Sequence, residues 1–182
     1  MDLALRALID PDVDWIFTAC QDPDIQRWTT VPVPYTRAHA EDFIATAPER
    51  PWTWAVVDGP ADGAHTPGPA RRGLAMASIH EIDPVTGEAD AGYWVAPWAR
   101  RRGVATWAVG QLVERARAIA EARSVALIIA AENVASRRTA EAAGFTLVAD
   151  ATEEAPDRRD HDLSASDQLV AAVRYRLVLS DG

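Results

Sequence analysis

The chain has 182 residues, 48% hydrophobic and 25% charged, values typical of a globular protein that folds as one domain over residues 1–182. The net charge of −9 argues against general binding to nucleic acid or to acidic membranes. The single cysteine, Cys20, excludes an internal disulfide and a thiolate metal cluster, while no apolar run is long enough to span a membrane. The start MDLALRALIDPDVD lacks the pattern of a signal peptide, so we expect a cytoplasmic protein.

The first third of the chain predicts two strands and three short helices. Asp, Thr and Pro residues at their starts are the usual helix-start signals. The expected elements are a strand over Leu3–Ile9, a helix capped by Asp12 or Asp14, a helix capped by Asp22, an extended Pro-rich segment before Tyr35, a helix capped by Thr36 and a strand over Trp52–Val57.

The remainder predicts five more strands and two helices, after a Gly- and Pro-rich loop over residues 58–72. The helix from Val104 places Ala108, Leu112, Ala116 and Ile119 on one face. The other expected elements are a hairpin of Gly73–Ile82 and Ala89–Val95, a strand over Val125–Ala130, a helix over Ala135–Ala143 ended by Gly144, a strand from Phe145 to Val148, an acidic loop over Asp150–Asp167 and a strand over Leu169–Leu179. The pattern indicates an α+β domain with a mixed sheet of about seven strands.

The segment Gly92–Thr106, GYWVAPWARRRGVAT, joins a strand to a helix through three arginines and a glycine. The first N–H groups of a helix have no partner within the helix, and the helix dipole is positive there. Gly103 lets the backbone approach an anion, and Arg100, Arg101 and Arg102 add charge. The segment therefore predicts a phosphate site; the alternative is an arginine cluster on a solvated loop.

A second motif follows the strand over Val125–Ala130. Asn133, Ser136, Arg138, Gly144 and Phe145 have the spacing N-x-x-S-x-R-x-x-x-x-x-G-F. Together with R-x-x-G-x-A upstream, this motif resembles the GNAT superfamily of acyl-CoA-dependent N-acyltransferases. The Tyr-Trp pair and the N-terminal run DPDIQRWTTVPVPYT resemble its RimJ/RimL-type branch. The resemblance covers most of residues 3–145.

The resemblance implies a GNAT-like, mostly antiparallel sheet with helices on both faces, a three-layer arrangement splayed between the fourth and fifth strands. It also implies that acetyl-CoA is the donor, with a backbone amide near Val95 polarising the thioester carbonyl. The residues expected to hold the co-substrate are Trp94, Val95, Arg100, Arg101, Arg102, Gly103, Val104, Ala105, Thr106, Asn133, Ser136 and Arg138.

The same resemblance makes Ser136 the candidate acid for the departing thiolate. The plainer interpretations are that Asn133 caps a helix and that Ser136 is a polar residue of its first turn. The general base is open among His80, Glu81, Glu88 and Asp90, and we select Glu88. An α-amino acceptor needs less help than a lysine, whose higher pKa costs roughly 3.4 kcal/mol more to neutralise.

On the acceptor side, the expected pocket walls are Trp28, Pro34 and Tyr35. The acceptor is a small amine or the N-terminal amine of a peptide or protein, although the chain departs from the RimJ/RimL pattern after Phe145, which argues against a ribosomal-protein substrate. His39, His65 and His161 have no metal-ligand spacing, so no metal is expected. The alternatives are a non-catalytic CoA-binding sensor and an enzyme using another donor such as succinyl-CoA; the protein would be a monomer or a homodimer.

Overall fold

The computed structural model describes residues 1–59, 72–156 and 169–179, and joins them in one sheet of seven strands in the order β1-β2-β3-β4-β5-β7-β6. The elements are β1 (Leu3–Arg6), α1 (Asp12–Ala19), α2 (Pro23–Trp28), α3 (Arg37–Ala45), η1 (Ala47–Glu49), β2 (Thr53–Asp58), β3 (Ala75–Ile82), β4 (Glu88–Val95), η2 (Pro97–Ala99), α4 (Val104–Arg117), β5 (Ser124–Ala130), α5 (Val134–Ala142), β6 (Thr146–Pro156) and β7 (Leu169–Val178). Most of the predicted Gly- and Pro-rich loop, and the acidic stretch after Pro156, lie outside the described residues.

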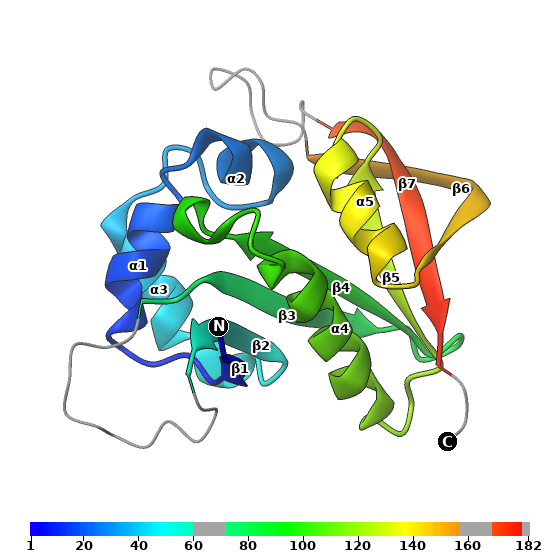
Figure 1. Cartoon of the computed structure of the whole chain (residues 1–182), viewed down its shortest axis with the longest axis horizontal. Helices are drawn as coiled ribbons and strands as arrows, with labels where there is room; N and C mark the ends of the chain where they lie inside the picture. Colours follow the sequence, from blue (N-terminus) through cyan, green and yellow to red (C-terminus); the bar gives the residue numbers. More distant parts are fainter. Residues whose placement is uncertain (60–71, 157–168, 180–182) are drawn as a thin grey trace.

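Helices cover both faces of the sheet, as the sequence predicts (Figure 1). On one face, Ile16 of α1 and Ile44 of α3 pack against Met76 of β3. On the other, the buried stripe of α4 that includes Leu112 packs against small and branched residues of the central strands. None of the helices in the described ranges combines the length and the apolar character needed to cross a membrane.

The sheet is splayed between β4 and β5. These strands pair in parallel only where Glu88–Asp90 lies beside Ser124–Ala126, although both continue beyond this point. The other edge of β5 pairs with β7 along its whole length. From Ala91 onward, β4 therefore has an edge of backbone groups with no strand beside it, as the family resemblance implies.

Local capping signals give mixed results. Asp22 accepts hydrogen bonds from two backbone amides of α2, and Thr36 forms a capping box with His39, as predicted. Neither Asp12 nor Asp14 caps α1: Pro11 holds the N-cap position, and no side chain bonds there. The reason is that Asp12 is buried inside the first turn, where its carboxylate binds the side chains of Arg6 and Trp15.

Two strand boundaries differ from those expected. β1 ends at Arg6 instead of Ile9, because Ile9 already belongs to the turn that starts α1 and donates its N–H to Asp12. β6 continues to Pro156, through residues expected to form an acidic loop. Pairing with β7 extends this strand, since residues 153–156 lie opposite residues 169–172.

A buried ion cluster joins the strands at the narrow end of the splay. Glu88 starts β4, and its side chain is only 10% exposed. Its carboxylate accepts hydrogen bonds from Arg174 and Arg176 of β7, the strand on the far side of β5. Glu88 thus connects β4 to β7 across the short parallel pairing, which keeps the two halves of the sheet together where they still touch.

Replacing Glu88 tests this account. We expect Glu88→Ala to lower the free energy of unfolding by about 2 kcal/mol, because two arginines lose a charge-assisted hydrogen bond. Urea denaturation measures the change. Glu81→Ala is the control on an exposed neighbour and should stay within about 0.5 kcal/mol of the parent chain. Equal urea midpoints for both variants would show that the cluster does not stabilise the fold.

Candidate active site

The turn between η2 and α4 is built to hold an anion. Gly103 is the N-cap of α4 with φ of 77°, and it makes no side-chain cap bond. Arg101 also has a positive φ, 60°. Left-handed residues at the start of a helix turn successive N–H groups toward one point, where the helix dipole is positive. The amides of Val104, Ala105 and Thr106 therefore face an anion-binding position with no capping side chain in it.

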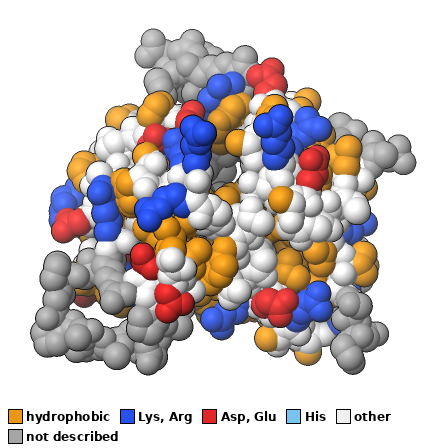
Figure 2. All heavy atoms as spheres, in the orientation of Figure 1, with side chains coloured by type: hydrophobic (Ala, Val, Ile, Leu, Met, Phe, Trp, Pro, Cys, Tyr) orange, Lys and Arg blue, Asp and Glu red, His pale blue; other side chains and the backbone are white. Residues whose placement is uncertain are grey.

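The three arginines of this turn have different surroundings. Arg100 bonds to Asp22 at 2.5 Å and to Asp24 at 3.1 Å, and so ties the turn to the start of α2. Arg101 and Arg102 are exposed and have no ion-pair partner in the described ranges. Figure 2 shows basic side chains gathered on the upper part of the face that carries α4 and α5. Arg100 thus joins the turn to α2, and contact of Arg100, Arg101 and Arg102 with a phosphate group remains a prediction.

The backbone of Val95 faces the splay. Ala96 donates its N–H to Leu74, on the β3 side, at 2.9 Å. Backbone groups of successive strand residues point alternately to the two neighbouring strands. The N–H and C=O of Val95 therefore point the other way, toward the edge that β5 has left. An extended chain lying in the splay would meet these groups first.

A hydroxyl pair bridges the splay on the α4 side. The Tyr93 hydroxyl lies 2.9 Å from Oγ of Ser136, which is in the first turn of α5. Burial raises the pKa of Tyr93, against smaller lowering effects of hydrogen bonds to Ser136 and Thr139. The phenol therefore keeps its proton and can donate it. The sequence motifs did not single out the Tyr93 side chain. Its position next to Trp94 in the strand was an available indication, because adjacent side chains of a strand point to opposite faces of the sheet.

Two other predicted site residues, Asn133 and Arg138, lie at the start of α5 and on its exposed side. Oδ1 of Asn133 accepts a hydrogen bond from the Ser136 N–H at 3.1 Å, so Asn133 caps α5, and its side-chain NH₂ group is left for a ligand. Arg138 is exposed on the same helix. Contact of Asn133 and Arg138 with the co-substrate remains a prediction.

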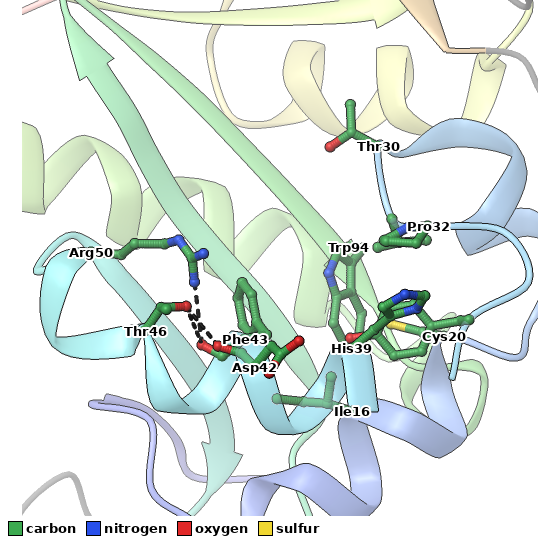
Figure 3. Close-up of a pocket in the computed structure, with 12 residues that line it drawn as sticks. Ile16, Cys20, Thr30, Pro32, His39, Asp42, Phe43, Thr46, Arg50 and Trp94 are labelled. Atoms are coloured by element: carbon green, nitrogen blue, oxygen red, sulfur yellow. Dashed lines mark hydrogen bonds between the residues drawn. The ribbon is translucent and has the colours of Figure 1, made fainter. Parts of the chain in front are cut away.

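A pocket of about 430 Å³ opens on the opposite face of the sheet, between α1, α3 and the Pro-rich segment (Figure 3). Of the three expected pocket walls, Tyr35 lines this pocket, and Trp28 and Pro34 are not among its lining residues; a role of any of the three in acceptor binding remains a prediction. Trp28 packs with Ile128 and Val170 of β5 and β7 instead. The lining residues are Ile16, Cys20, Thr30, Val31, Pro32, Tyr35, His39, Asp42, Phe43, Thr46, Arg50 and Trp94.

The contribution of α3 to this pocket could have been found from its spacing. His39, Asp42, Phe43 and Thr46 recur at intervals of three and four residues and so share one helix face. Figure 3 shows the side chains of His39, Asp42 and Phe43 on the pocket side, near Trp94 of β4. Trp94 thus lines the pocket next to the unpaired edge at Val95.

A buried contact series fixes Trp94. Asp12, fully buried, accepts two hydrogen bonds from Arg6, at 2.6 and 2.7 Å, and one from Nε1 of Trp15 at 2.6 Å. The Trp15 ring in turn contacts the Trp94 ring at a centroid distance of 5.5 Å. The position of Trp94 therefore depends on a carboxylate that the sequence presented as a helix cap.

The cysteine in the pocket wall is not activated. Burial raises the pKa of Cys20 to about 12, and a hydrogen bond with Tyr35 opposes this only in part. The thiolate, not the thiol, is the nucleophile, so Cys20 is unsuited to forming a covalent intermediate. No group of three or more His, Cys, Asp or Glu residues in the described ranges could hold a metal ion.

Glu88 and Ser136 do not lie together. Glu88 is at the narrow end of the splay with Arg174 and Arg176, whereas Tyr93 and Val95 lie five and seven residues further along β4. At about 3.3 Å per residue, Glu88 is ~23 Å along the strand from Val95. This position does not favour the base role chosen from the sequence, because β4 holds the carboxylate away from the pocket.

The splayed edge of β4 leads directly into the exposed start of α4, an arrangement that can receive an extended ligand with a phosphate group at one end. The acetyltransferase (GNAT) domain family matches residues 2–146, and the chain belongs to this family of acetyltransferases.

Individual relatives agree with this family. The Bacillus subtilis (strain 168) protein YdaF, whose name assigns it provisionally to the ribosomal N-acetyltransferases, is 36% identical over 70 residues, 38% of each chain. The spermidine N-acetyltransferase of Vibrio cholerae, solved with CoA and spermine, has a TM-score of 0.73 at 17% identity, over 97% of this chain and 95% of its own. RimL, a ribosomal L7/L12 α-N-protein acetyltransferase solved with CoA, has a TM-score of 0.70 at 16% identity, over 98% and 95%.

The left-handed turn gives a matched pair of variants. A Cβ at Gly103 would meet no atom within 4 Å, so Gly103→Ala tests backbone conformation alone. We expect it to lower the free energy of unfolding by about 1 kcal/mol, because L residues rarely adopt a φ of 77°. Gly110→Ala, equally uncrowded but inside α4, should raise it by about 0.8 kcal/mol. Denaturant titration of both variants checks the two signs; the same sign for both would contradict the left-handed turn.

Proposed function

We propose that this protein transfers the acetyl group of acetyl-CoA to a primary amine by direct attack, with both substrates bound together. The observation that carries the proposal is the run from Tyr93 to Thr106. It joins an unpaired strand edge, whose Val95 N–H faces the splay, to a helix start with an anion-binding turn. Coenzyme A has a pantetheine arm suited to such an edge and a pyrophosphate suited to such a turn.

Each residue of the site has a role in this proposal. The Val95 N–H stabilises the oxyanion that forms on the thioester carbonyl. Ser136, backed by Tyr93, gives its proton to the departing thiolate. The amides of residues 104–106, with Arg101 and Arg102, hold the pyrophosphate, and the Asn133 amide contacts the pantetheine arm. Acetyl-CoA supplies an activated acyl group, so the chain needs no metal for this chemistry.

The pocket supports an acceptor with one positive charge on a compact apolar body. Its walls are mainly aromatic and aliphatic, including Val31, Phe43 and Trp94. Among its described lining residues, Asp42 is the single carboxylate, and its side chain has no partner there. Arg50 lies at the same pocket, where it stacks on Phe43, and it would repel a second ammonium group. The charges therefore favour a monoamine or a short peptide N-terminus over a polyamine.

The experiment is a thiol-release assay with acetyl-CoA and a panel of acceptors: phenylethylamine, a short apolar peptide with a free N-terminus, and spermidine. We expect turnover with one of the first two and little with spermidine. Succinyl-CoA in place of acetyl-CoA tests the donor. Acetyl-CoA binding without turnover over the whole panel would contradict the proposal and favour a CoA sensor.

Asp42 should set the affinity for a cationic acceptor. We expect Asp42→Asn to raise the acceptor KM about fivefold, equivalent to an exposed ion pair of about 1 kcal/mol, with the KM for acetyl-CoA unchanged. Glu41→Gln is the matched control, because Glu41 is the adjacent exposed carboxylate of α3 and pairs with Arg37 outside the pocket. An equal effect of the two variants would remove Asp42 from acceptor recognition.

The Tyr93 and Ser136 hydroxyl groups should affect kcat and not the binding of acetyl-CoA. We expect Ser136→Ala and Tyr93→Phe each to lower kcat about tenfold, a modest loss for a general acid because a thiolate with a pKa near 8.5 leaves easily. The Kd for acetyl-CoA, measured by calorimetry, should not change. A change confined to Kd would make the pair a binding contact instead of a proton donor.

A further inference from the structure

None of the roles assigned so far removes a proton from the acceptor: at the pocket wall, Nδ1 of His39 already accepts the Thr36 N–H in the capping box of α3, and Asp42 is assigned to the charge of the ammonium group. An alkylammonium ion has no lone pair and cannot attack a thioester until a base removes its proton. Glu88 is far along β4 and engaged with two arginines. A base must instead lie on the acceptor side of β4, near Trp94. This inference rests on the proposed function and deepens it.

His80 of β3 lies over the backbone of β4 at Gly92. A Cβ added to Gly92 would be 2.6 Å from Nε2 of His80, so the imidazole fills the space that any other residue would occupy. Side chains two apart on a strand share a face, which puts Gly92 on the same side as Trp94. The missing side chain of Gly92 thus lets the imidazole lie beside the residue that lines the acceptor pocket.

A bulge in the hairpin presents this side chain. The register of β3 and β4 shifts between Ile79, opposite Ala91, and Glu81, opposite Asp90, so His80 is the extra residue. Bulges re-aim a side chain and are frequent next to active sites. His80 is exposed, so an acquired proton can pass to water.

Acidic side chains from both strands lie around His80. Asp90 lies on the same face of β4, and its pKa is raised by burial and by Glu81 and Glu88, while His80 and Arg174 oppose the rise. Asp90 and Glu81 are the acidic groups that flank the imidazole on the two strands.

We infer that His80 is the general base of the transfer, acting directly or through one water molecule. Gly92 and Trp94 are two residues apart, ~7 Å along the strand, so the imidazole lies close to the wall of the pocket. His80 takes one proton from the ammonium group, and the freed nitrogen lone pair forms the N–C bond with the carbonyl carbon. The C–S bond then breaks, the sulfur takes a proton from Ser136, and the second proton of the nitrogen passes through water to Ser136 and restores its hydroxyl. The sum is an amide, a thiol and one proton released to solvent.

The experiment compares His80→Gln with the parent chain on two acceptors of similar shape, phenylethylamine and the weakly basic phenylhydrazine, over a range of pH. We expect His80→Gln to lower kcat/KM about 10²-fold for phenylethylamine, and much less for phenylhydrazine, which is already neutral. The ionisation that limits kcat/KM on the acid side should disappear. Gly92→Ala, which keeps the histidine but displaces it, should reproduce the loss.

Controls separate the possible failures. Acetyl-CoA affinity, measured by calorimetry, should be the same in all variants, and Glu41→Gln, which changes an exposed carboxylate outside the pocket, should keep the parent activity. If the parent chain acetylates amines but His80→Gln has the same kcat/KM and pH profile, His80 is not the base. Equal losses on both acceptors would also overturn the inference. If the parent chain itself transfers no acetyl group to any amine, it is the proposed function that fails.

Discussion

The unpaired edge of β4 is the constraint on which the rest of the structure depends. A strand inside a sheet normally has both edges satisfied, because a backbone N–H that lacks a partner is costly away from water. Here the parallel pairing with β5 stops at Asp90. The Glu88 cluster fixes the strands just before this point, and the Tyr93–Ser136 hydroxyl pair spans the gap beyond it. The edge is thus held open between two polar contacts.

The side chains on the two faces of β4 point to two different parts of the proposed site. Odd-numbered residues such as Tyr93 point toward α4 and α5, where the co-substrate is proposed to lie. Even-numbered residues such as Trp94 point toward α1 and α3, where the pocket proposed to take the acceptor lies. Because alternation is a property of any strand, one short segment can serve two substrates without a domain interface. Arg100 adds a direct link, since it joins the anion-binding turn to α2.

Donor-side features were predictable because they are local in sequence. The strand, the arginine turn, Gly103 and the start of α4 are contiguous, and the helix-start chemistry follows from their order. Acceptor-side features depend on contacts between distant residues. Trp28 and Trp94 look alike in sequence, and only the packing of Trp94 on Trp15 and of Trp28 on Ile128 separates their roles. Likewise, the sequence alone suggests that Glu88 is an exposed carboxylate at the edge of a strand. Its pairing with Arg174 and Arg176 depends on the position of β7 next to β5, which local sequence does not reveal.

Amide hydrogen exchange with and without acetyl-CoA is the most direct test of co-substrate binding at the open edge of β4. It reports on the individual backbone N–H groups that are proposed to contact acetyl-CoA. Acetyl-CoA should slow exchange at Val95 and at residues 104–106, while exchange at Trp94, whose N–H points to β3, should change little. Binding of acetyl-CoA with protection elsewhere, and none at Val95 or the start of α4, would contradict this binding mode.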